Sequence, residues 1–284
     1  MKTFWIRTAS AAVYVLLFLG TLLSGYLLKN PQLGHCLFAV FVAFVTLGCT
    51  DEFFRMVERQ GAAPCRILGY IYVVAVLLLV SLVPMCDFVT GFKVVLAAVV
   101  LLPTLFALSA IVQLWGYSEQ PFREAAYTMV PMLYIAVPLS LMIAMLPEVG
   151  ARVLLMVIVM VWINDSGAYI GGSLFGKHKM WARHSPGKTW EGTAFGVLVT
   201  MLVAVFVGPW IQPALAWYHW MALGFLCSVV DTLGDLVESM LKRSVGVKDS
   251  GTIMPGHGGF LDRFDSLLVV IPFVSAYLAV VASL

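Results

Sequence analysis

Charged residues are scarce in this sequence. Only 11% of its 284 residues are Asp, Glu, Lys or Arg, while 61% are hydrophobic. A soluble domain averages about 45–50% apolar and about 25% charged residues, so this composition excludes an ordinary soluble fold and indicates a protein built for lipid. The formal net charge is only +2. That value argues against nucleic acid as a partner, because nucleic-acid-binding domains carry a strong basic excess.

The sequence also lacks paired cysteines, internal repeats and flexible linkers. Its five cysteines are scattered without any CxxC pair, which excludes a disulfide framework and a zinc site. No Gly/Ser-rich or Pro-rich stretch divides the chain. We therefore expect a single polytopic membrane domain over residues 1–284. Polarity is uneven within it, which predicts a membrane platform at 1–120 and places the residues that could carry chemistry in the half at 121–284.

Apolar stretches of about spanning length recur along the whole chain. They cover residues 9–28, 33–50, 67–86, 92–115, 128–146, 151–170, 193–211, 214–233 and 266–284. Each crossing of the hydrocarbon core needs roughly 20 residues in a helix, so the fold class is all-α with about nine transmembrane helices. The first stretch resembles a signal peptide, but its length and the spans that follow favour an uncleaved helix.

Basic residues predict the orientation of these helices. With a cytoplasmic N-terminus and alternating spans, only Lys29, Lys93 and Arg152 fall on the far side. The other fourteen of the 17 basic residues fall on the cytoplasmic side. The positive-inside rule therefore places the N-terminus in the cytoplasm. The polar clusters described below lie on that same side, so we expect a polar cavity that opens to the cytoplasm.

The densest group of charges and glycines lies at 231–265. Asp231, Asp235 and Glu238 stand at i, i+4 and i+7, so a helix places all three carboxylates on one face. The glycines of 246–259 then predict a loop that folds back closely, with Asp262 and Asp265 one turn apart beyond it. Clustered carboxylates repel unless a cation or proton intervenes, and oxygen ligands beside basic residues suit Mg²⁺ bound to phosphates.

Two further segments carry candidate chemistry. Asp165 lies inside an apolar stretch, where an ionisable group is costly and indicates function; the alternative is that Asn164-Asp165 ends a short helix. Residues 176–192 read GKHKMWARHSPGKTWEG. In its core, Ser185 to Thr189, Gly and Pro predict a tight turn that opens a helix at Thr189 and holds phosphate oxygens. The alternative is a basic membrane anchor, and the GxxxxGK[ST] spacing of a P-loop is missing.

Simpler interpretations exist for other polar residues. Asp51-Glu52 is interpreted as an interfacial helix end, and His257 either contacts phosphate or only bonds the backbone of its turn. The carboxylate face could instead be a salt-bridged helix end, because Glu238 and Lys242 stand at i,i+4. An ion-coupled transporter would also carry intramembrane acids, but it requires groups accessible from both sides. The acid pattern of CDP-alcohol phosphotransferases is missing.

The residues from Ser239 to Asp265 carry a resemblance to a known family. Ser239, Lys242-Arg243, Lys248-Asp249 and the run from Pro255 to Asp265 closely resemble the 27-residue signature of phosphatidate cytidylyltransferases, also called CDP-diacylglycerol synthases. Met254 stands where the signature usually has Leu, Ile or Phe, a conservative change. The segments 164–169 and 185–192 are also similar to motifs of the family. The N-terminal half resembles it only as a series of spans.

The resemblance implies substrates, cofactors and roles. It implies CTP and phosphatidic acid as substrates, CDP-diacylglycerol and pyrophosphate as products, Mg²⁺ as cofactor, and room for a second, monovalent cation such as K⁺. It also implies a multi-pass protein of the bacterial inner (plasma) membrane with its site facing the cytoplasm. A homodimer is one option for its assembly.

The expected site residues fall into three groups, which share residues. The metal ligands are Asp235 and Asp262, with Asp231 and Asp265 next. The residues expected to hold CTP and its phosphates are Asp165, Ser185, Lys188 and Thr189. The remaining catalytic residues, beside Asp235 and Asp262, are Lys242, Arg243, Lys248, Asp249, His257 and Arg263.

The charge distribution makes a testable prediction about topology. Reporter fusions after residues 120 and 190 should be cytoplasmic, and a fusion after residue 284 should lie on the opposite side. A cytoplasmic C-terminus would require an even number of spans and would contradict the scheme.

Overall fold

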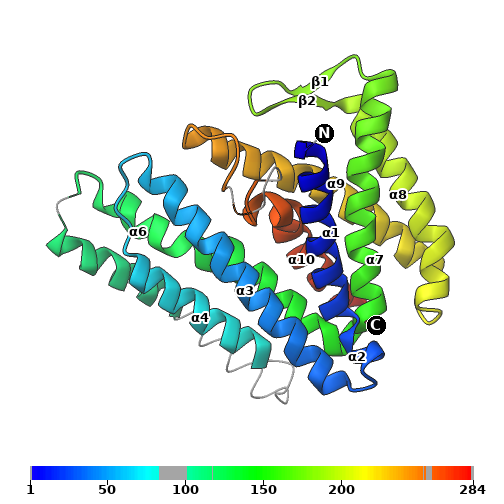
Figure 1. The fold of residues 1–284 in the computed structure, drawn as a ribbon, viewed down its shortest axis with the longest axis horizontal. Coiled ribbons are helices and arrows are strands. Elements are labelled where there is room, and N and C mark those ends of the chain that lie inside the picture. Colours follow the sequence, from blue (N-terminus) through cyan, green and yellow to red (C-terminus); the bar gives the residue numbers. More distant parts are fainter. Residues whose placement is uncertain (1, 83–100, 117, 252, 254–257, 283–284) are drawn as a thin grey trace. The chain divides into compact units, whose positions relative to one another are not determined.

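The computed structural model describes residues 2–82, 101–116, 118–251, 253 and 258–282 (Figure 1). Most of these residues are helical, as the apolar stretches predicted. The chain divides into two compact units, which are described separately. Unit 1 comprises Met1–Glu148 and Val245–Arg263, and unit 2 comprises Val149–Ser244 and Phe264–Leu284. The predicted division at residue 120 stays a prediction.

Unit 1 is built from helices of very different length. They are α1 (Lys2–Leu22), α2 (Ser24–Leu27), α3 (Pro31–Glu58), α4 (Arg66–Leu82), a helix over 101–112, η2 (Gln113–Trp115), α6 (Pro121–Val130), the π-helical η3 (Pro131–Ala136) and the first part of α7 (Val137–Phe175). Asn30 begins α3, because its side chain accepts the N–H of Leu33 at 3.1 Å and Pro31 occupies the first turn. α3 and α4 pack side by side (Figure 1). Residues 245–260, which return to this unit, form no helix where they are described.

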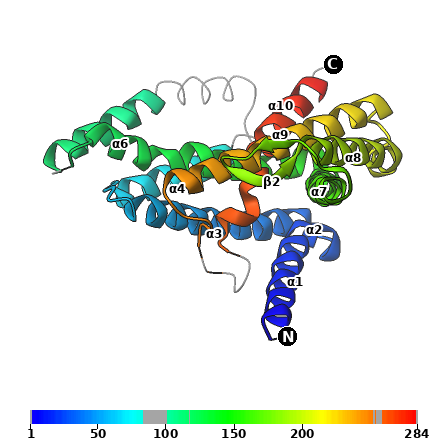
Figure 2. The ribbon, with the colours of Figure 1, turned by 90° about the horizontal axis from the view of Figure 1, so that it is seen from above.

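Unit 2 contains the rest of α7 and the C-terminal elements. These are β1 (Lys179–Trp181), β2 (Ser185–Thr189), α8 (Trp190–Ile211), α9 (Trp217–Ser244) and α10 (Leu261–Ala282), which belongs to unit 2 from Phe264 onward. α8 and α9 pack against each other as a helical hairpin, visible in both views (Figures 1 and 2). Within α7, Gly150 has φ 80° and ψ 154°, so the helix is interrupted there. The two predicted spans at 128–146 and 151–170 are therefore separate helical segments.

The helices match the predicted membrane segments. Among the described residues, five helices are long and apolar enough to cross a membrane: Pro31–Glu58, Pro121–Phe175, Trp190–Ile211, Trp217–Ser244 and Leu261–Ala282. Three shorter apolar helices, Ala12–Leu22, Arg66–Val80 and Leu101–Trp115, fall on the other predicted stretches. An all-α polytopic membrane fold is thus confirmed. One correction is the small antiparallel sheet formed by β1 and β2, which an all-α prediction omits.

Polar and apolar residues are distributed as lipid surroundings require. Large apolar side chains are exposed on the long helices, for example Phe44 at 61% and Phe206 at 70%. Several charged groups are buried instead, among them Glu52, Asp231 and Glu238. Since lipid offers no hydrogen bonds, charged groups are placed inside the protein, where other residues supply partners.

Close contact between α7 and α8 positions the polar residues of unit 2. A side chain at Gly196 would lie 2.8 Å from the backbone oxygen of Asn164, and one at Gly192 would lie 2.6 Å from the backbone oxygen of Ala168. Only glycine permits this distance between the helices. The start of α8 is thereby held against the polar segment of α7.

Candidate functional site

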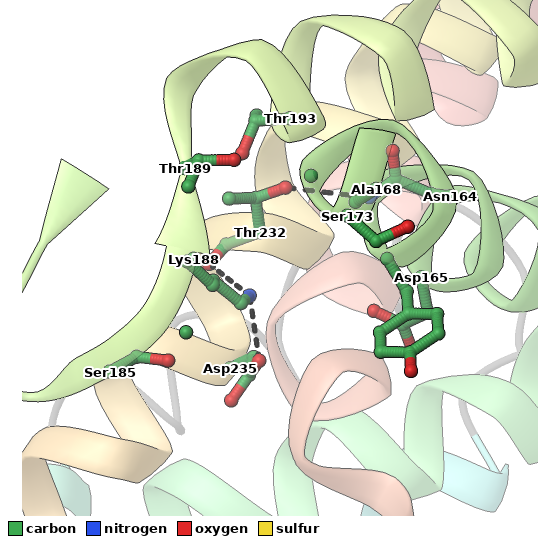
Figure 3. Close-up of a pocket in the computed structure, with 13 residues that line it drawn as sticks. Asn164, Asp165, Ala168, Ser173, Ser185, Lys188, Thr189, Thr193, Thr232 and Asp235 are labelled. Carbon is green, nitrogen blue, oxygen red and sulfur yellow. Dashed lines mark hydrogen bonds and ion pairs between the residues drawn. The ribbon is translucent and has the colours of Figure 1, made fainter. Parts of the chain in front are cut away.

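Three segments of unit 2 converge on one pocket that contains several polar and charged side chains (Figure 3). α7 contributes Asp165, the β2–α8 junction contributes Ser185, Lys188 and Thr189, and α9 contributes Asp235. The cavity has a volume of about 420 Å³. All five residues come from the sequence-predicted set, and the fold brings them to one place. Asn164 and Thr232 also line the pocket.

Lys188 joins the hairpin to α9. Its Nζ lies 2.6 Å from Oδ2 of Asp235, and it also donates to the backbone oxygen of Thr232 at 3.4 Å (Figure 3). The side chains are 20% and 30% exposed, so the ion pair lines the cavity and remains partly accessible to solvent. A cation is therefore held beside a carboxylate at the edge of a space that can admit a ligand.

The segment Ser185 to Thr189 differs from the predicted tight turn. It forms strand β2, with Thr189 opposite Lys179 and Ser185 opposite Trp181. The predicted helix start is confirmed: Thr189 is the N-cap of α8, and its hydroxyl accepts the N–H of Gly192 at 3.2 Å. The turn prediction is wrong because pairing with β1 extends the segment, and a single sequence did not reveal that pairing.

Glu191 is a structural residue that the sequence interpretation missed. In the first turn of α8, its carboxylate accepts the backbone N–H groups of Lys177 and His178, at 3.1 and 3.2 Å. It also pairs with Nδ1 of His178 at 2.5 Å. These contacts tie the entry of the hairpin to α8, so they fix the strand that carries Lys188. An acid just after an N-cap residue was the available signal.

Asn164 and Asp165 lie within α7, which continues to Phe175. The alternative that they end a short helix is therefore wrong. Asp165 is exposed in the pocket wall, whereas Asn164 is 1% exposed and points to the interior. The amide of Asn164 donates to Oδ2 of Asp231 at 2.6 Å, and also to the backbone oxygen of Ser228 at 3.2 Å.

The carboxylate face of α9 is confirmed as helical, and its members differ in surroundings. Asp231 is fully buried and held by Asn164. Asp235 and Glu238 lie beside Asp265 of α10, and one ligand oxygen from each of the three lies within 4.8 Å of the others. Glu238 is buried and forms an ion pair with Lys242, as the salt-bridge interpretation expected. The salt-bridge and metal-site interpretations therefore both apply, because Glu238 pairs with Lys242 and also belongs to an acidic cluster.

The acidic cluster (Asp235, Glu238 and Asp265) suits a hard divalent cation. Its donors are all carboxylate oxygens, the ligands that Mg²⁺ prefers. Lys188 and Lys242 pair with two of its members, which leaves an excess of negative charge for a cation to offset. Sequence reasoning placed Glu238 on the same helix face as Asp235 and named Asp235 and Asp265 as ligands, but it did not name Glu238 as one.

The remaining predicted residues divide between the units. Asp262 belongs to unit 1, where its Oδ2 accepts hydrogen bonds from the N–H of Ser250 at 2.9 Å, the hydroxyl of Ser250 at 2.9 Å and the N–H of Gly259 at 2.8 Å. Its predicted pairing with Asp235 of unit 2 stays a prediction. His257 lies outside the described residues. Exposed positions are occupied by Arg243, Lys248, Asp249 and Arg263.

A protein-family match and several relatives were found for this chain, and the family match covers nearly all of it. Residues 5–281 match the Cytidylyltransferase family. The chain is 33% identical over 276 residues to a phosphatidate cytidylyltransferase of Staphylococcus epidermidis (strain RP62A), an alignment that covers 96% of this chain and 98% of the relative. It is 40% identical over 160 residues to that of Bacillus subtilis (strain 168), covering 56% and 60%. With that of Staphylococcus aureus (strain COL) the identity is 36% over 183 residues, covering 63% and 70%.

The acidic cluster predicts that divalent metal stabilises the folded protein. Saturating Mg²⁺ should raise the melting temperature of the detergent-solubilised chain relative to EDTA, because a ligand that binds only the folded state stabilises it. Asp235→Asn keeps the side-chain volume but removes one charged ligand, so the Mg²⁺-dependent increase should shrink. The matched control is Asp51→Asn, which removes a carboxylate that is ion-paired with Arg55 and Arg66 in unit 1. Equal increases in wild type and Asp235→Asn would exclude Asp235 as a ligand.

Proposed function

The chain belongs to the cytidylyltransferase family, and from this membership we propose that it is a phosphatidate cytidylyltransferase. Its reaction would convert CTP and phosphatidic acid into CDP-diacylglycerol and pyrophosphate. The observation that carries the proposal is the Lys188–Asp235 ion pair, which places a cation next to the acidic cluster at one cavity. Such a site suits two phosphate-bearing substrates that repel each other.

The proposed chemistry is an in-line nucleotidyl transfer. An oxygen of the phosphatidate phosphate forms a bond to the α-phosphorus of CTP, and the bond from that phosphorus to the bridging α–β oxygen breaks. The electron pair of the broken bond leaves with pyrophosphate. A phosphate monoester has a second pKa of about 6, so the nucleophile is mostly ionised near neutral pH and needs no strong general base. Positioning and charge neutralisation are what the protein must supply.

The residues of unit 2 fit this requirement. Lys188 extends from the hairpin over the cavity and would hold phosphate oxygens, exchanging its contact with Asp235 for a contact with substrate. Ser185 and Thr189 line the same wall and would orient the nucleotide. Thr189 would contribute while it caps α8, since a hydroxyl that accepts one hydrogen bond can still donate another.

Asp235, Glu238 and Asp265 are the residues that would hold Mg²⁺ in unit 2. Bound there, the ion would supply charge neutralisation for the phosphates. Asp231 suits a different task, because it is fully buried and hydrogen-bonded to Asn164. We propose that it positions the polar segment of α7 beside the pocket.

The membrane location is proposed from composition and charge. The exposed apolar side chains of the long helices fit a lipid bilayer, which would also deliver phosphatidic acid and accept its product. We propose a multi-pass protein of the bacterial inner membrane, with its N-terminus and active site facing the cytoplasm, where CTP is available. The distribution of basic residues supports this orientation.

A direct assay tests the proposed function. The purified chain in detergent, supplied with labelled CTP and Mg²⁺, should release pyrophosphate and form labelled lipid only when phosphatidic acid is present. Diacylglycerol without the phosphate serves as the control acceptor and should give no product. Pyrophosphate release that does not depend on phosphatidic acid would contradict the proposal.

Lys188 provides a second test within the same assay. Lys188→Ala should lower the catalytic efficiency with CTP by about 10–100-fold, since a charge-assisted hydrogen bond contributes about 1.5–3 kcal/mol. Lys188→Arg should recover only part of it, because a planar guanidinium replaces a compact ammonium. The matched control is Lys179→Ala, which removes an exposed lysine from the paired strand β1. Kinetics with CTP that match wild type in Lys188→Ala would remove Lys188 from the phosphate site.

A further inference from the structure

Glu52 of α3 is buried in unit 1, although the sequence suggested only an interfacial helix end. Its neighbour Asp51 fits that interpretation, since it pairs with Arg55 and Arg66 and is partly exposed. Glu52 is 2% exposed and contacts the far end of the chain. The interpretation is therefore wrong for Glu52.

The carboxylate of Glu52 accepts two backbone hydrogen bonds from the segment 250–261 and shares the single hydroxyl proton of Ser250 with Asp262. Oε1 accepts the N–H of Phe260 at 2.9 Å, and Oε2 accepts the N–H of Leu261 at 2.9 Å. Oε2 also lies 3.0 Å from the hydroxyl of Ser250. Ser250 before the loop and Phe260 after it thus both contact one carboxylate. The carboxylate also lies at the start of α10, where the unpaired N–H groups of a helix N-terminus favour a negative charge.

Asp262 shares these contacts. The hydroxyl of Ser250 lies between the two carboxylates, 3.0 Å from Glu52 and 2.9 Å from Oδ2 of Asp262. The same Asp262 oxygen accepts the N–H groups of Ser250 and Gly259. The position of the Asp262 carboxylate therefore depends on a loop conformation that Glu52 holds from α3.

The glycines of the loop are consistent with this arrangement. A Cβ added at Gly259 would meet both oxygens of Glu52 and the hydroxyl of Ser250. At Gly251 an added Cβ would lie 2.5 Å from Oε1 of Glu52. The carboxylate and the two glycines therefore fit together in a way that leaves no room for a side chain at positions 251 and 259.

A purely structural role explains Glu52 less well. Burying a carboxylate is costly, and among the described residues no lysine or arginine forms an ion pair with Glu52. An apolar residue in place of Glu52 could pack α3 against the loop without the free-energy cost of burying a charge. A buried charge with these donors does, however, impose one geometry on the groups that bind it.

We propose that Glu52 is a positioning residue, which holds Ser250, the start of α10 and, through them, the Asp262 carboxylate in the arrangement that catalysis uses. The expected effect of Glu52 on turnover rests on the proposed function. Its expected effect on the position of the loop does not. A side chain from the second long helix of the chain would then control the geometry of a motif about two hundred residues later. α3 would then act on the chemistry through the position of the Asp262 carboxylate.

Glu52→Gln tests the proposal with the matched control Glu124→Gln. The glutamine keeps the volume but presents one acceptor and one N–H₂ donor to the donors of Phe260 and Leu261, so one backbone N–H loses its partner. Glu124 is also fully buried in unit 1 and accepts a loop N–H, that of Ala63 at 2.6 Å, but it lies far from the glycine-rich loop in sequence. Both variants should melt at lower temperature than wild type.

The two variants should differ in two other measurements. Trypsin should cleave after the exposed Lys248 faster in Glu52→Gln than in wild type or Glu124→Gln, as shown by the masses of the fragments. In the phosphatidate assay, kcat should fall about 10–100-fold in Glu52→Gln alone, with a higher Mg²⁺ requirement, as is typical when a residue that orients a metal ligand is lost.

Each outcome decides between the proposals. Unchanged cleavage after Lys248 in Glu52→Gln, or an equal increase in Glu124→Gln, would overturn the positioning role whatever the activity. If wild type shows no phosphatidate-dependent turnover, the proposed function fails, while the cleavage result still decides whether Glu52 holds the loop. Should Glu52→Gln fail to fold, Ser250→Ala removes one of the three contacts and should show the same changes at smaller size. Wild-type cleavage and kinetics in Ser250→Ala would then count against the proposal.

Discussion

Carboxylates buried in a lipid-facing bundle require donors or cations nearby, and this requirement organises both units of the protein. Lipid supplies neither, so the partners come from other segments of the chain. In unit 2, Asn164 donates to Asp231, while lysines pair with Asp235 and Glu238. In unit 1, backbone N–H groups and a serine hydroxyl serve Glu52. Asp231 thus connects α9 to α7, and Glu52 connects α3 to the start of α10, at specific points that apolar packing alone would leave less defined.

The β1–β2 hairpin gives Lys188 a more rigid support than a turn would. Strand pairing holds one side of the hairpin, and Glu191 at the start of α8 holds its entry. Close contact of α7 with α8, made possible by Gly192 and Gly196, keeps this assembly against the polar part of α7. The long, flexible side chain of Lys188 is thereby brought to the carboxylate of Asp235 on α9. Preorganised charge of this kind stabilises a developing anion without rearrangement during the reaction.

The proposed reaction joins a water-soluble nucleotide to a lipid, and the distribution of polarity in the chain corresponds to that task. Exposed apolar side chains cover the long helices, while Asp165, Lys188 and Asp235 line one cavity and Glu52 and Asp262 both contact Ser250. Because the substrates are both anions, the protein needs cations and metal-binding acids close together. Lysines that pair with carboxylates satisfy this need and also limit the cost of buried charge.

Local features of this protein were determined by the sequence itself. The length of the apolar runs determined the helices, the i, i+4, i+7 spacing determined the acidic face of α9, and Thr189 marked the start of α8. These features depend on hydrogen bonds and side-chain periodicity within a few residues, which a single sequence displays. Only the tertiary structure brought Lys188 to Asp235, placed Asp265 beside Asp235 and Glu238, and buried Glu52 against Phe260. Those outcomes depend on which distant segments pack together, and that choice follows from the summed packing and pairing of the whole chain rather than from any local pattern.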